Sequence, residues 1–281
     1  MILLTGVTGT LASTLIEQSF NLPILGISRD WVKQQQITNK YIKLEICDIA
    51  DINALHRLFR TYCITHIVNT AALKCLHRCE DNPAEAMKVN VIGVQNLYDL
   101  CQEFDAKLLQ VSTDKSVLAC NIYGATKHIS EKIVLKNKDN VVTRYGNVWG
   151  SRGSVVPIFI KSLLENKSVD ITDVNMSRFF ITKQEAASFV INSLMNKKGL
   201  QVPHMKAALI IDIAHTIAKI LSINAFNVNV VGIKPGEKIY EDLISVFERH
   251  LGEPMSSRDA PKFTETELTA LLTPIVKEHL Q

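Results

Sequence analysis

The sequence predicts an α/β fold built on a doubly wound parallel sheet, and three observations lead to that prediction. Short apolar runs rich in β-branched residues alternate with segments of helical periodicity through the first half of the chain. A glycine-rich turn separates the first apolar run from the first helical segment. The 281 residues are enough for one large domain, or for a domain with an added lobe.

The expected elements of the first half follow one another as strand and helix. Expected strands occupy residues 2–4, 23–27, 42–46, 66–69, 108–111 and 141–144. Expected helices occupy residues 11–20, 52–62, 83–104 and 123–136. Strands joined by helices run parallel, so the helices cover both faces of the sheet.

After Gly150 the pattern is less regular, which predicts a smaller C-terminal α/β lobe. Its expected elements are helices at 155–165, 184–195, 209–221 and 264–280 and a strand at 227–232. We therefore expect a cofactor-binding domain at 1–150 and a substrate-binding lobe at 151–281, with interleaved chain segments. No linker rich in glycine and serine separates the two, so the lobe is expected to pack closely on the domain.

Composition narrows the class of function. A net charge of +3 is too small to indicate a protein that binds nucleic acid. No apolar run reaches the length of a membrane span, and the first residues lack a secretory signal. Six scattered cysteines favour reduced thiols and a cytoplasmic protein, without nucleic-acid or membrane partners. The spacing of Cys75, His77 and Cys79 matches no common zinc pattern, so we expect no metal.

The turn from Thr5 to Ala12 predicts a Rossmann-type dinucleotide site. Gly6 allows a tight turn after the first strand, and Gly9 lets a pyrophosphate approach the backbone. Ala12 is small enough for the helix to pack closely on the strand. The amino terminus of that helix presents free N–H groups to the phosphates.

The end of the second expected strand bears on the choice of cofactor. Arg29 suits the 2′-phosphate of NADP, whereas Asp30 suits the ribose diol of NAD. We expect NADP, with NAD as the second choice. Asp48, after the third strand, is placed to bind adenine, and its alternative role is to cap the helix that begins near Asp51.

The segment Ser112–Lys115, followed by Tyr123 and Lys127, is the strongest indication of catalysis. Residues four apart share a helix face, so Lys127 is expected beside the phenol of Tyr123, where its charge favours the phenolate. A phenolate can take a proton from a sugar hydroxyl. Asp114 and Lys115 add a second acid–base pair, which simple alcohol oxidation does not need. This additional acid–base pair indicates oxidation followed by elimination.

Seven motifs occur in order along the chain and resemble those of one known family. They are residues 5–12, 112–115, 121–127, 144–148, 150–157, 176–179 and 235–238. Together they are similar to the extended short-chain dehydrogenase/reductases. Within that group they most resemble the soluble, inverting UDP-N-acetylglucosamine 4,6-dehydratases of the pseudaminic-acid type, from residue 2 to about residue 245.

The resemblance implies a role for each catalytic residue. Tyr123 deprotonates the 4-hydroxyl as hydride leaves carbon 4, and Thr113 hydrogen-bonds the 4-oxygen. Lys127 lowers the pKa of the tyrosine and binds the nicotinamide ribose. Lys115 removes the proton of carbon 5, and Asp114 protonates the departing 6-hydroxyl. Hydride then returns to carbon 6, and carbon 5 is expected to invert.

The resemblance also implies the binding residues, with Asn90 supporting the active site. The residues implied for the cofactor are Gly6, Thr8, Gly9, Thr10, Leu11, Ser28, Arg29, Asp48, Ile49, Ala71, Ala72, Lys74, Asn90, Tyr123 and Lys127. Those implied for the UDP-sugar are Lys74, Asn147, Arg152, Val156, Thr172, Met176, Arg178 and Glu237. An arginine fork suits a diphosphate, although ordinary surface charge is the alternative for these charged residues. Relatives form homo-oligomers, which we also expect here.

The chain departs from the family pattern at three places. Cys75 stands where a histidine is usual, Leu118 and Ala119 stand where an Asn-Pro pair is usual, and Lys234 replaces an arginine. A nucleotide-sugar 4-epimerase or 4-reductase is the alternative enzyme, since neither needs the pair formed by Asp114 and Lys115. A non-catalytic NADP-binding sensor or scaffold is the alternative of another class.

Overall fold

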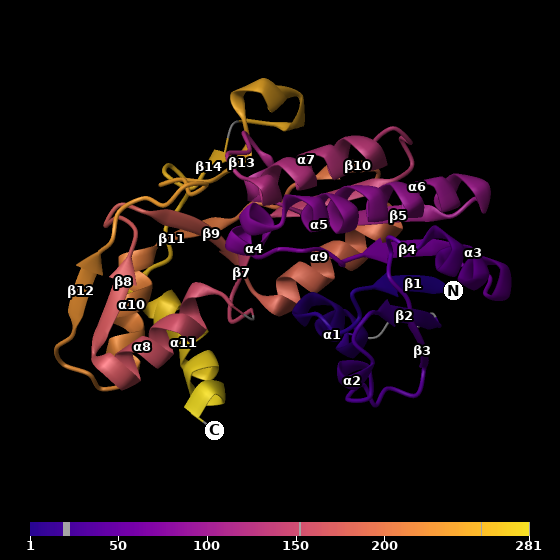
Figure 1. The fold of residues 1–281 in the computed structure, drawn as a ribbon. Helices are drawn as coiled ribbons and strands as arrows, with labels where there is room; N and C mark the ends of the chain where they lie inside the picture. Colours follow the sequence, from indigo (N-terminus) through magenta and orange to yellow (C-terminus); the bar gives the residue numbers. More distant parts are fainter. Residues whose placement is uncertain (19–22, 152, 254, 281) are drawn as a thin grey trace. The chain divides into compact units, whose positions relative to one another are not determined.

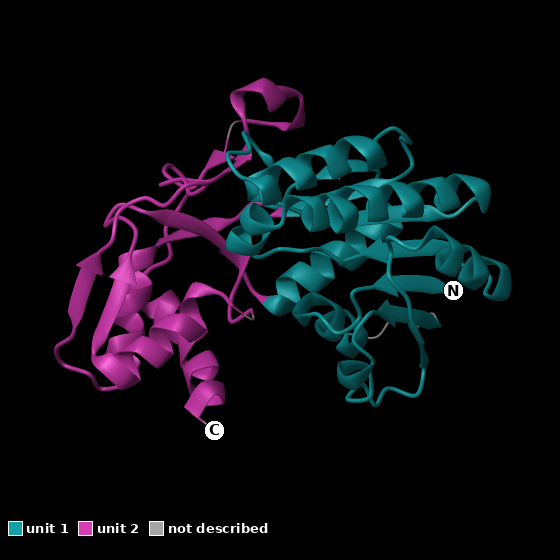
Figure 2. Cartoon of the chain, in the orientation of Figure 1, with its two compact units in different colours: residues 1–144, 183–203 teal, residues 145–182, 204–281 magenta. Residues whose placement is uncertain are grey.

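The computed structural model describes residues 1–18, 23–151, 153–253 and 255–280 (Figure 1). The chain forms two compact units, one made of residues 1–144 and 183–203 and the other of 145–182 and 204–281 (Figure 2). Residues 145–150, which we expected in the first domain, belong to the second unit. The division of cofactor and substrate binding between the units stays a prediction.

The first unit is built on a seven-stranded sheet with the order β3-β2-β1-β4-β5-β6-β10. Its strands are β1 (Ile2–Thr5), β2 (Ile24–Ser28), β3 (Ile42–Ile46), β4 (His66–Asn69), β5 (Lys107–Thr113), β6 (Val141–Tyr145) and β10 (Gly199–Gln201). β1 pairs in parallel with both β2 and β4, and β2–β3, β4–β5 and β6–β10 are parallel as well. The predicted Rossmann-type sheet is thereby confirmed, and the order of its strands reverses at β1, where such folds bind ligands.

Helices cover both faces of this sheet. They are α1 (Thr10–Glu17), α2 (Trp31–Gln34), α3 (Ile52–Thr61), α4 (Leu76–Asp81), α5 (Pro83–Met87), α6 (Gly93–Glu103), α7 (Ile122–Val134) and α9 (Lys183–Asn196). α1 and α9 pack against each other. Leu3 and its neighbours Ile2 and Leu4 are all buried, although alternation along β1 turns them to opposite faces. Neither face of the sheet is therefore open to solvent at β1.

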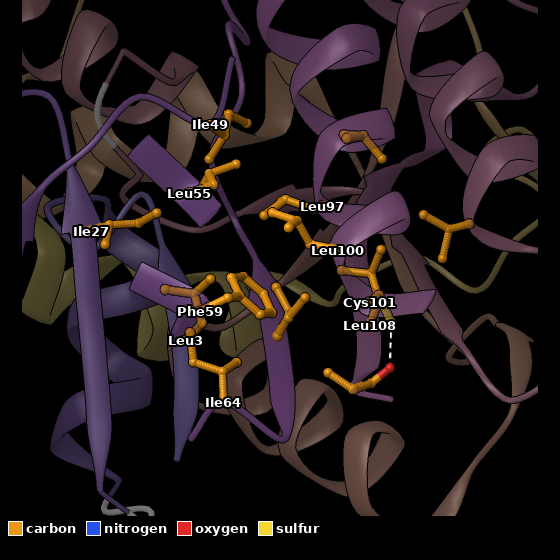
Figure 3. Packing of buried hydrophobic residues seen from close by; sticks show 14 of the residues in the cluster. Leu3, Ile27, Ile49, Leu55, Phe59, Ile64, Leu97, Leu100, Cys101 and Leu108 are labelled. Atoms are coloured by element: carbon orange, nitrogen blue, oxygen red, sulfur yellow. Dashed lines mark hydrogen bonds between the residues drawn. The ribbon is translucent and has the colours of Figure 1, made fainter. Parts of the chain in front are cut away.

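The main core lies between the sheet and helices α3, α6 and α7. Figure 3 shows Leu3 of β1 near Phe59 of α3, and Leu97 and Leu100 of α6 reaching toward the same apolar cluster. All four side chains are at most 5% exposed. Burial on this scale is the main favourable contribution to folding, at about 25 cal/mol per Å² of apolar surface.

The helix expected at 83–104 is present, but it contains a π-helical segment that the periodicity did not indicate. Between α5 and α6 the chain forms a π-helical segment, η1 (Lys88–Ile92), which contains the buried Asn90. Its side chain accepts a hydrogen bond from Leu73 N (2.8 Å) and donates to Leu73 O (3.0 Å). A π-bulge of this kind often marks a functional site. The periodicity could not reveal it, because its partner is a loop far away in sequence.

The described residues of the second unit form three small sheets, three α-helices and one 3₁₀ helix. Its elements are β7 (Asn147–Val148), α8 (Val155–Asn166), β8 (Ser168–Ile171), β9 (Ser177–Ile181), β11 (Lys206–Leu209), α10 (Ile210–Ile220), β12 (Asn227–Val230), β13 (Asp242–Ile244), η3 (Val246–Leu251), β14 (Met255–Ser256) and α11 (Glu265–Leu280). The sheets have the orders β11-β9-β7, β12-β8 and β13-β14. Trp149 stacks on Phe180 at 3.9 Å inside the core of this unit. Within the described part of the chain, no helix combines the length and apolar character needed to cross a membrane.

Replacing Gly6 with alanine is expected to destabilise the protein by about 2–5 kcal/mol. Gly6 has φ +65°, and an added Cβ would lie 2.9 Å from Ala71 N. Gly199 has a similar φ of +71° but nothing within 4 Å of an added Cβ. Gly199→Ala should therefore cost only the left-handed conformation, about 1–2 kcal/mol. Chemical denaturation measures both, and equal losses would show that the contact with Ala71 is unimportant.

Candidate active site

Three acid–base side chains lie together where β5 ends. Thr113 is the last residue of β5 and is followed by a single 3₁₀ turn, η2 (Asp114–Ser116). Asp114 is fully buried, and its Oδ1 accepts hydrogen bonds from Thr113 Oγ1 (3.0 Å) and Lys115 Nζ (3.0 Å). Its Oδ2 has no hydrogen-bond partner among the described residues. A buried acceptor of this kind costs about 1–3 kcal/mol unless a ligand supplies a donor.

Helix α7 lies directly against this turn. Asn121 caps it by accepting a hydrogen bond from Gly124 N (2.7 Å), so Tyr123 falls in its first turn. A Cβ on Gly124 would lie only 2.1 Å from Lys115 O. Glycine at this position therefore permits the helix to approach the turn, and this approach brings Tyr123 to the acid–base pair.

The surroundings of Tyr123 disfavour its phenolate form. Burial raises its pKa to about 12, and the charge of Asp114 acts in the same direction. The charge of Lys115 and a hydrogen bond with Thr113 lower it. The side chains predicted as catalytic thus interact with one another electrostatically.

Lys127 differs from the expectation. Its ammonium donates a hydrogen bond to Val111 O at 2.6 Å, on β5. Burial lowers its pKa to about 8, and the charge of Glu131 opposes that change. The charge of Lys115 lowers the pKa of Tyr123, and the influence of Lys127 on the phenol stays a prediction. The carbonyl of β5 attracts this ammonium, and helical spacing alone could not indicate that.

The predicted cofactor loop follows β1 at the switch point of the sheet. Thr5 Oγ1 hydrogen-bonds Asn69 Oδ1 and accepts from Ala71 N (3.2 Å), which ties the loop to the end of β4. Gly9 is exposed and occupies the N-cap of α1 without a side-chain cap. The first amides of α1 therefore remain available to an anion. Thr8, Thr10 and Leu11 belong to the same segment, and Ala72 follows at the end of β4.

Arg29 lies between two carboxylates at the end of β2. Its Nη1 is 3.1 Å from Glu85 Oε1 and 3.7 Å from Asp48 Oδ2. Asp30 is already engaged, because it caps α2 by accepting from Lys33 N (3.1 Å) and pairs with Lys33 Nζ (2.5 Å).

The neighbouring predicted residues serve local contacts. Ser28 Oγ accepts from Gln34 Nε2 at 3.0 Å. Asp48 accepts from Ala50 N at 3.0 Å. α3 is capped by Asp51, so the alternative of a cap by Asp48 was wrong. Ile49 is buried next to this turn.

The residues predicted to hold the UDP-sugar in the second unit are engaged with one another or with backbone. Arg178 donates to Ile239 O (2.9 Å) and Lys238 O (2.6 Å), so it is not a free surface charge. Glu237 accepts from Thr172 Oγ1 at 3.1 Å. Asn147 donates to Phe179 O (3.1 Å), whereas Val156 and Met176 are buried in the core. Arg152 lies outside the described residues, and Lys74 in the first unit is exposed.

Sequence reasoning missed the buried Glu131, which lies one turn after Lys127 on α7. It forms an ion pair with Arg144 of β6 at 2.6 Å, with both side chains 1% exposed. The spacing of four residues from Lys127 was a signal for it, because such residues share a helix face.

A parallel sheet of this order, with a glycine loop after β1 and a Thr–Tyr–Lys set after β5, is the arrangement of the short-chain dehydrogenase/reductases. A family described as polysaccharide biosynthesis protein matches residues 2–258. The chain belongs to this family.

Relatives with assigned activities are found by sequence. An inverting UDP-N-acetylglucosamine 4,6-dehydratase of Campylobacter jejuni is 36% identical over 270 residues, covering 89% of this chain and 79% of the relative. A UDP-glucose 4-epimerase of Rickettsia bellii is 30% identical, covering 95% and 87%. The solved structure of Pen from Bacillus thuringiensis has a TM-score of 0.88 and 26% identity, and covers 100% of this chain and 98% of that chain.

Proposed function

We propose that the protein is a UDP-N-acetylglucosamine 4,6-dehydratase. The observation that carries the proposal is the pair of Asp114 and Lys115, 3.0 Å apart and electrostatically coupled to Tyr123. Oxidation of a hydroxyl needs one base, whereas loss of water also needs a base at carbon 5 and an acid at carbon 6. The likeness to the Campylobacter dehydratase supports the same activity.

Each side chain then has a defined task. Tyr123 takes the proton of the 4-hydroxyl, and Thr113 donates a hydrogen bond to the 4-oxygen. Transfer of one proton from Lys115 to Asp114 across their 3.0 Å contact makes the lysine a base and the aspartic acid an acid. The 4-ketone acidifies the C5–H bond, so the neutral Lys115 can remove that proton. Asp114 protonates the 6-hydroxyl, which leaves as water. A bound nicotinamide nucleotide supplies the redox chemistry by accepting hydride from carbon 4 and returning it to carbon 6.

The test is a single incubation with UDP-N-acetylglucosamine. Mass spectrometry should find a product lighter by one water. An unchanged mass with a new 4-epimer would instead identify an epimerase, which the Rickettsia relative makes the second candidate. No conversion at all, with cofactor still bound, would favour the sensor or scaffold.

We propose inversion at carbon 5, because the resemblance is to the inverting group and the Campylobacter relative bears that description. Reaction in deuterated water should place deuterium at carbon 5 and give the proton couplings of the L-arabino sugar. A D-xylo 4-ketone as the first and only product would contradict inversion without affecting the dehydratase assignment.

We propose NADP as the cofactor. The tight turn at Gly6 supports the binding of a dinucleotide. An added Cβ there would lie 2.9 Å from Ala71 N, so only glycine lets the loop follow β1 in the way that dinucleotide-binding folds need. NADP rather than NAD is supported by Arg29, which is 57% exposed in its side chain, whereas Asp30 is engaged in capping α2. A ribose diol would have to displace Lys33 from Asp30. A 2′-phosphate would have to displace Glu85 from Arg29, but it would gain a charge-assisted pair with the exposed guanidinium.

Denaturing the purified protein should release NADP. Arg29→Gln should weaken NADP binding roughly 10- to 100-fold, since a hydrogen bond to a charged group contributes about 1.5–3 kcal/mol. NAD binding should change little in the same variant. Recovery of NAD alone from the wild type would overturn the choice.

We propose a cytoplasmic homo-oligomer. The six cysteines are all free, which supports a reducing compartment. Met87, Ile92 and Ile129 are 44–50% exposed on α5, η1 and α7, and these elements pack together. Such exposed apolar side chains support self-association through a closed symmetric contact. Analytical ultracentrifugation measures the oligomeric state, and a monomer at micromolar concentration would contradict self-association.

A further inference from the structure

A buried polar cluster joins the catalytic turn to the catalytic helix. We call Ser112, Ser116, Glu131 and Arg144 the Glu131 cluster. Glu131 Oε1 accepts from Ser112 Oγ (2.5 Å), Ser116 Oγ (2.7 Å) and Arg144 Nε (3.1 Å). Glu131 Oε2 accepts from Arg144 Nη2 at 2.6 Å. All four residues belong to the first unit, and each is at least nine-tenths buried.

The two serines stand immediately before and after the residues that carry the chemistry. Ser112 precedes Thr113, and Ser116 ends the η2 turn. Because both hydroxyls reach the same carboxylate oxygen, Glu131 fixes the two ends of the turn relative to each other. Ser116 Oγ is also 2.7 Å from Thr113 O, so its single hydrogen is shared between the two acceptors.

We propose that Glu131 is a positioning residue, which holds the turn carrying Thr113, Asp114 and Lys115 in register with the helix carrying Tyr123 and Lys127. The proposal rests on the proposed function for its catalytic consequence. Gly124 allows helix α7 to approach the η2 turn closely. The Glu131 cluster then fixes the distance between that helix and the turn. Effective catalysis needs such fixed geometry, because small displacements of acid–base groups are costly.

Glu131 also has an electrostatic effect on Lys127. Lys127 faces the carbonyl of Val111 on β5, and Tyr123 and Glu131 lie one turn away on either side of it along α7. The negative charge of Glu131 raises the pKa of Lys127, against the stronger effect of burial. Removing that charge lets the pKa fall below about 8, so Lys127 loses its proton at lower pH.

The double variant Ser112→Ala/Ser116→Ala tests the positioning role while leaving the buried ion pair intact. We expect kcat for water loss to fall roughly 10- to 100-fold with little change in KM. Amide hydrogen exchange at Lys115 and Val117 should become faster. Ser193→Ala is the matched control, because Ser193 is fully buried on α9 and its hydroxyl has no partner among the described residues.

The exchange measurement needs no substrate, so it remains decisive even if the wild type fails to dehydrate UDP-N-acetylglucosamine. That failure would refute the proposed function alone. Exchange rates and kcat equal to those of Ser193→Ala would refute the positioning role alone.

The variant Glu131→Gln tests the electrostatic part. The high-pH limb of its kcat profile should move to lower pH, and Glu131→Asp should restore much of the wild-type profile. An unmoved limb in a folded Glu131→Gln protein would overturn this part. If that variant does not fold because Arg144 is left unpaired, Glu131→Gln/Arg144→Gln is compared with Arg144→Gln, which also lacks the arginine charge. A limb at lower pH in the double variant supports this part, and an equal limb overturns it.

Discussion

Replacing Tyr123 with phenylalanine should lower the rate of the whole reaction roughly 10²- to 10⁴-fold, the usual range for an acid–base group. The first oxidation then lacks its base, so no later step can begin. The ring remains in place, and the fold and cofactor content should not change. Turnover of UDP-N-acetylglucosamine, followed by mass spectrometry, measures the effect.

Tyr98→Phe provides the control for loss of a hydroxyl, since Tyr98 packs at the margin of the main core. Turnover close to that of the control would mean that another group is the base. The pKa of about 12 for Tyr123 makes this a demanding prediction. Substrate and cofactor must lower that pKa, or the proton must leave the phenol together with the hydride.

Asp114→Asn and Lys115→Met should each lower the rate of water loss roughly 10²- to 10⁴-fold. Oxidation at carbon 4 uses Tyr123 and Thr113, so it should survive in Asp114→Asn. In Lys115→Met it should be slower, because the charge of Lys115 lowers the pKa of Tyr123. Absorbance in the near ultraviolet, due to reduced nicotinamide, should then build up during turnover. Normal dehydration by both variants would remove the main support for the dehydratase proposal.

Each of these single variants leaves the other member of the pair without its partner. An uncompensated buried charge is destabilising by several kcal/mol, about 3–5 for a buried ion pair. The double variant Asp114→Asn/Lys115→Met removes both charges and separates that effect from catalysis. It should be at least as stable as the singles and should still fail to release water.

Local pattern was enough to predict the parallel sheet. β1, β2 and β6 are short runs that are buried almost throughout, and burial on both faces requires such runs. β3, at the edge of the sheet, instead alternates apolar and charged residues. The turn at Gly6 was also predictable. A tight turn often needs a residue with positive φ, and glycine adopts that conformation readily, so a glycine in the sequence indicates such a turn. Interleaved chain segments were expected, but the return of residues 183–203 to the first unit was not, since β10 has only three residues and no distinctive pattern.

The candidate site was predictable as a set of residues but not as a set of contacts. The motif placed Tyr123, Asp114 and Lys115 together, because a strand, a tight turn and a helix follow one another within a few residues. It did not predict that Lys127 would donate to the Val111 carbonyl. Asn90 was expected to support the active site, but its hydrogen bonds to Leu73 O and Thr126 Oγ1 (both 3.0 Å) were not predicted. Long-range partners of this kind depend on the tertiary fold.

Because residues 183–203 return to the first unit, its sheet cannot be completed during synthesis until about 60 residues after β6 have left the ribosome. Until then β6 lacks its outer neighbour, and Lys107 Nζ lacks the carbonyl oxygens of Leu194 (2.6 Å) and Lys197 (3.1 Å). A nascent chain that stops at residue 150 would carry an open strand edge, which invites pairing with other chains. The first unit is therefore a poor candidate for expression as a simple N-terminal fragment, and premature termination products should be substrates for chaperones and proteases.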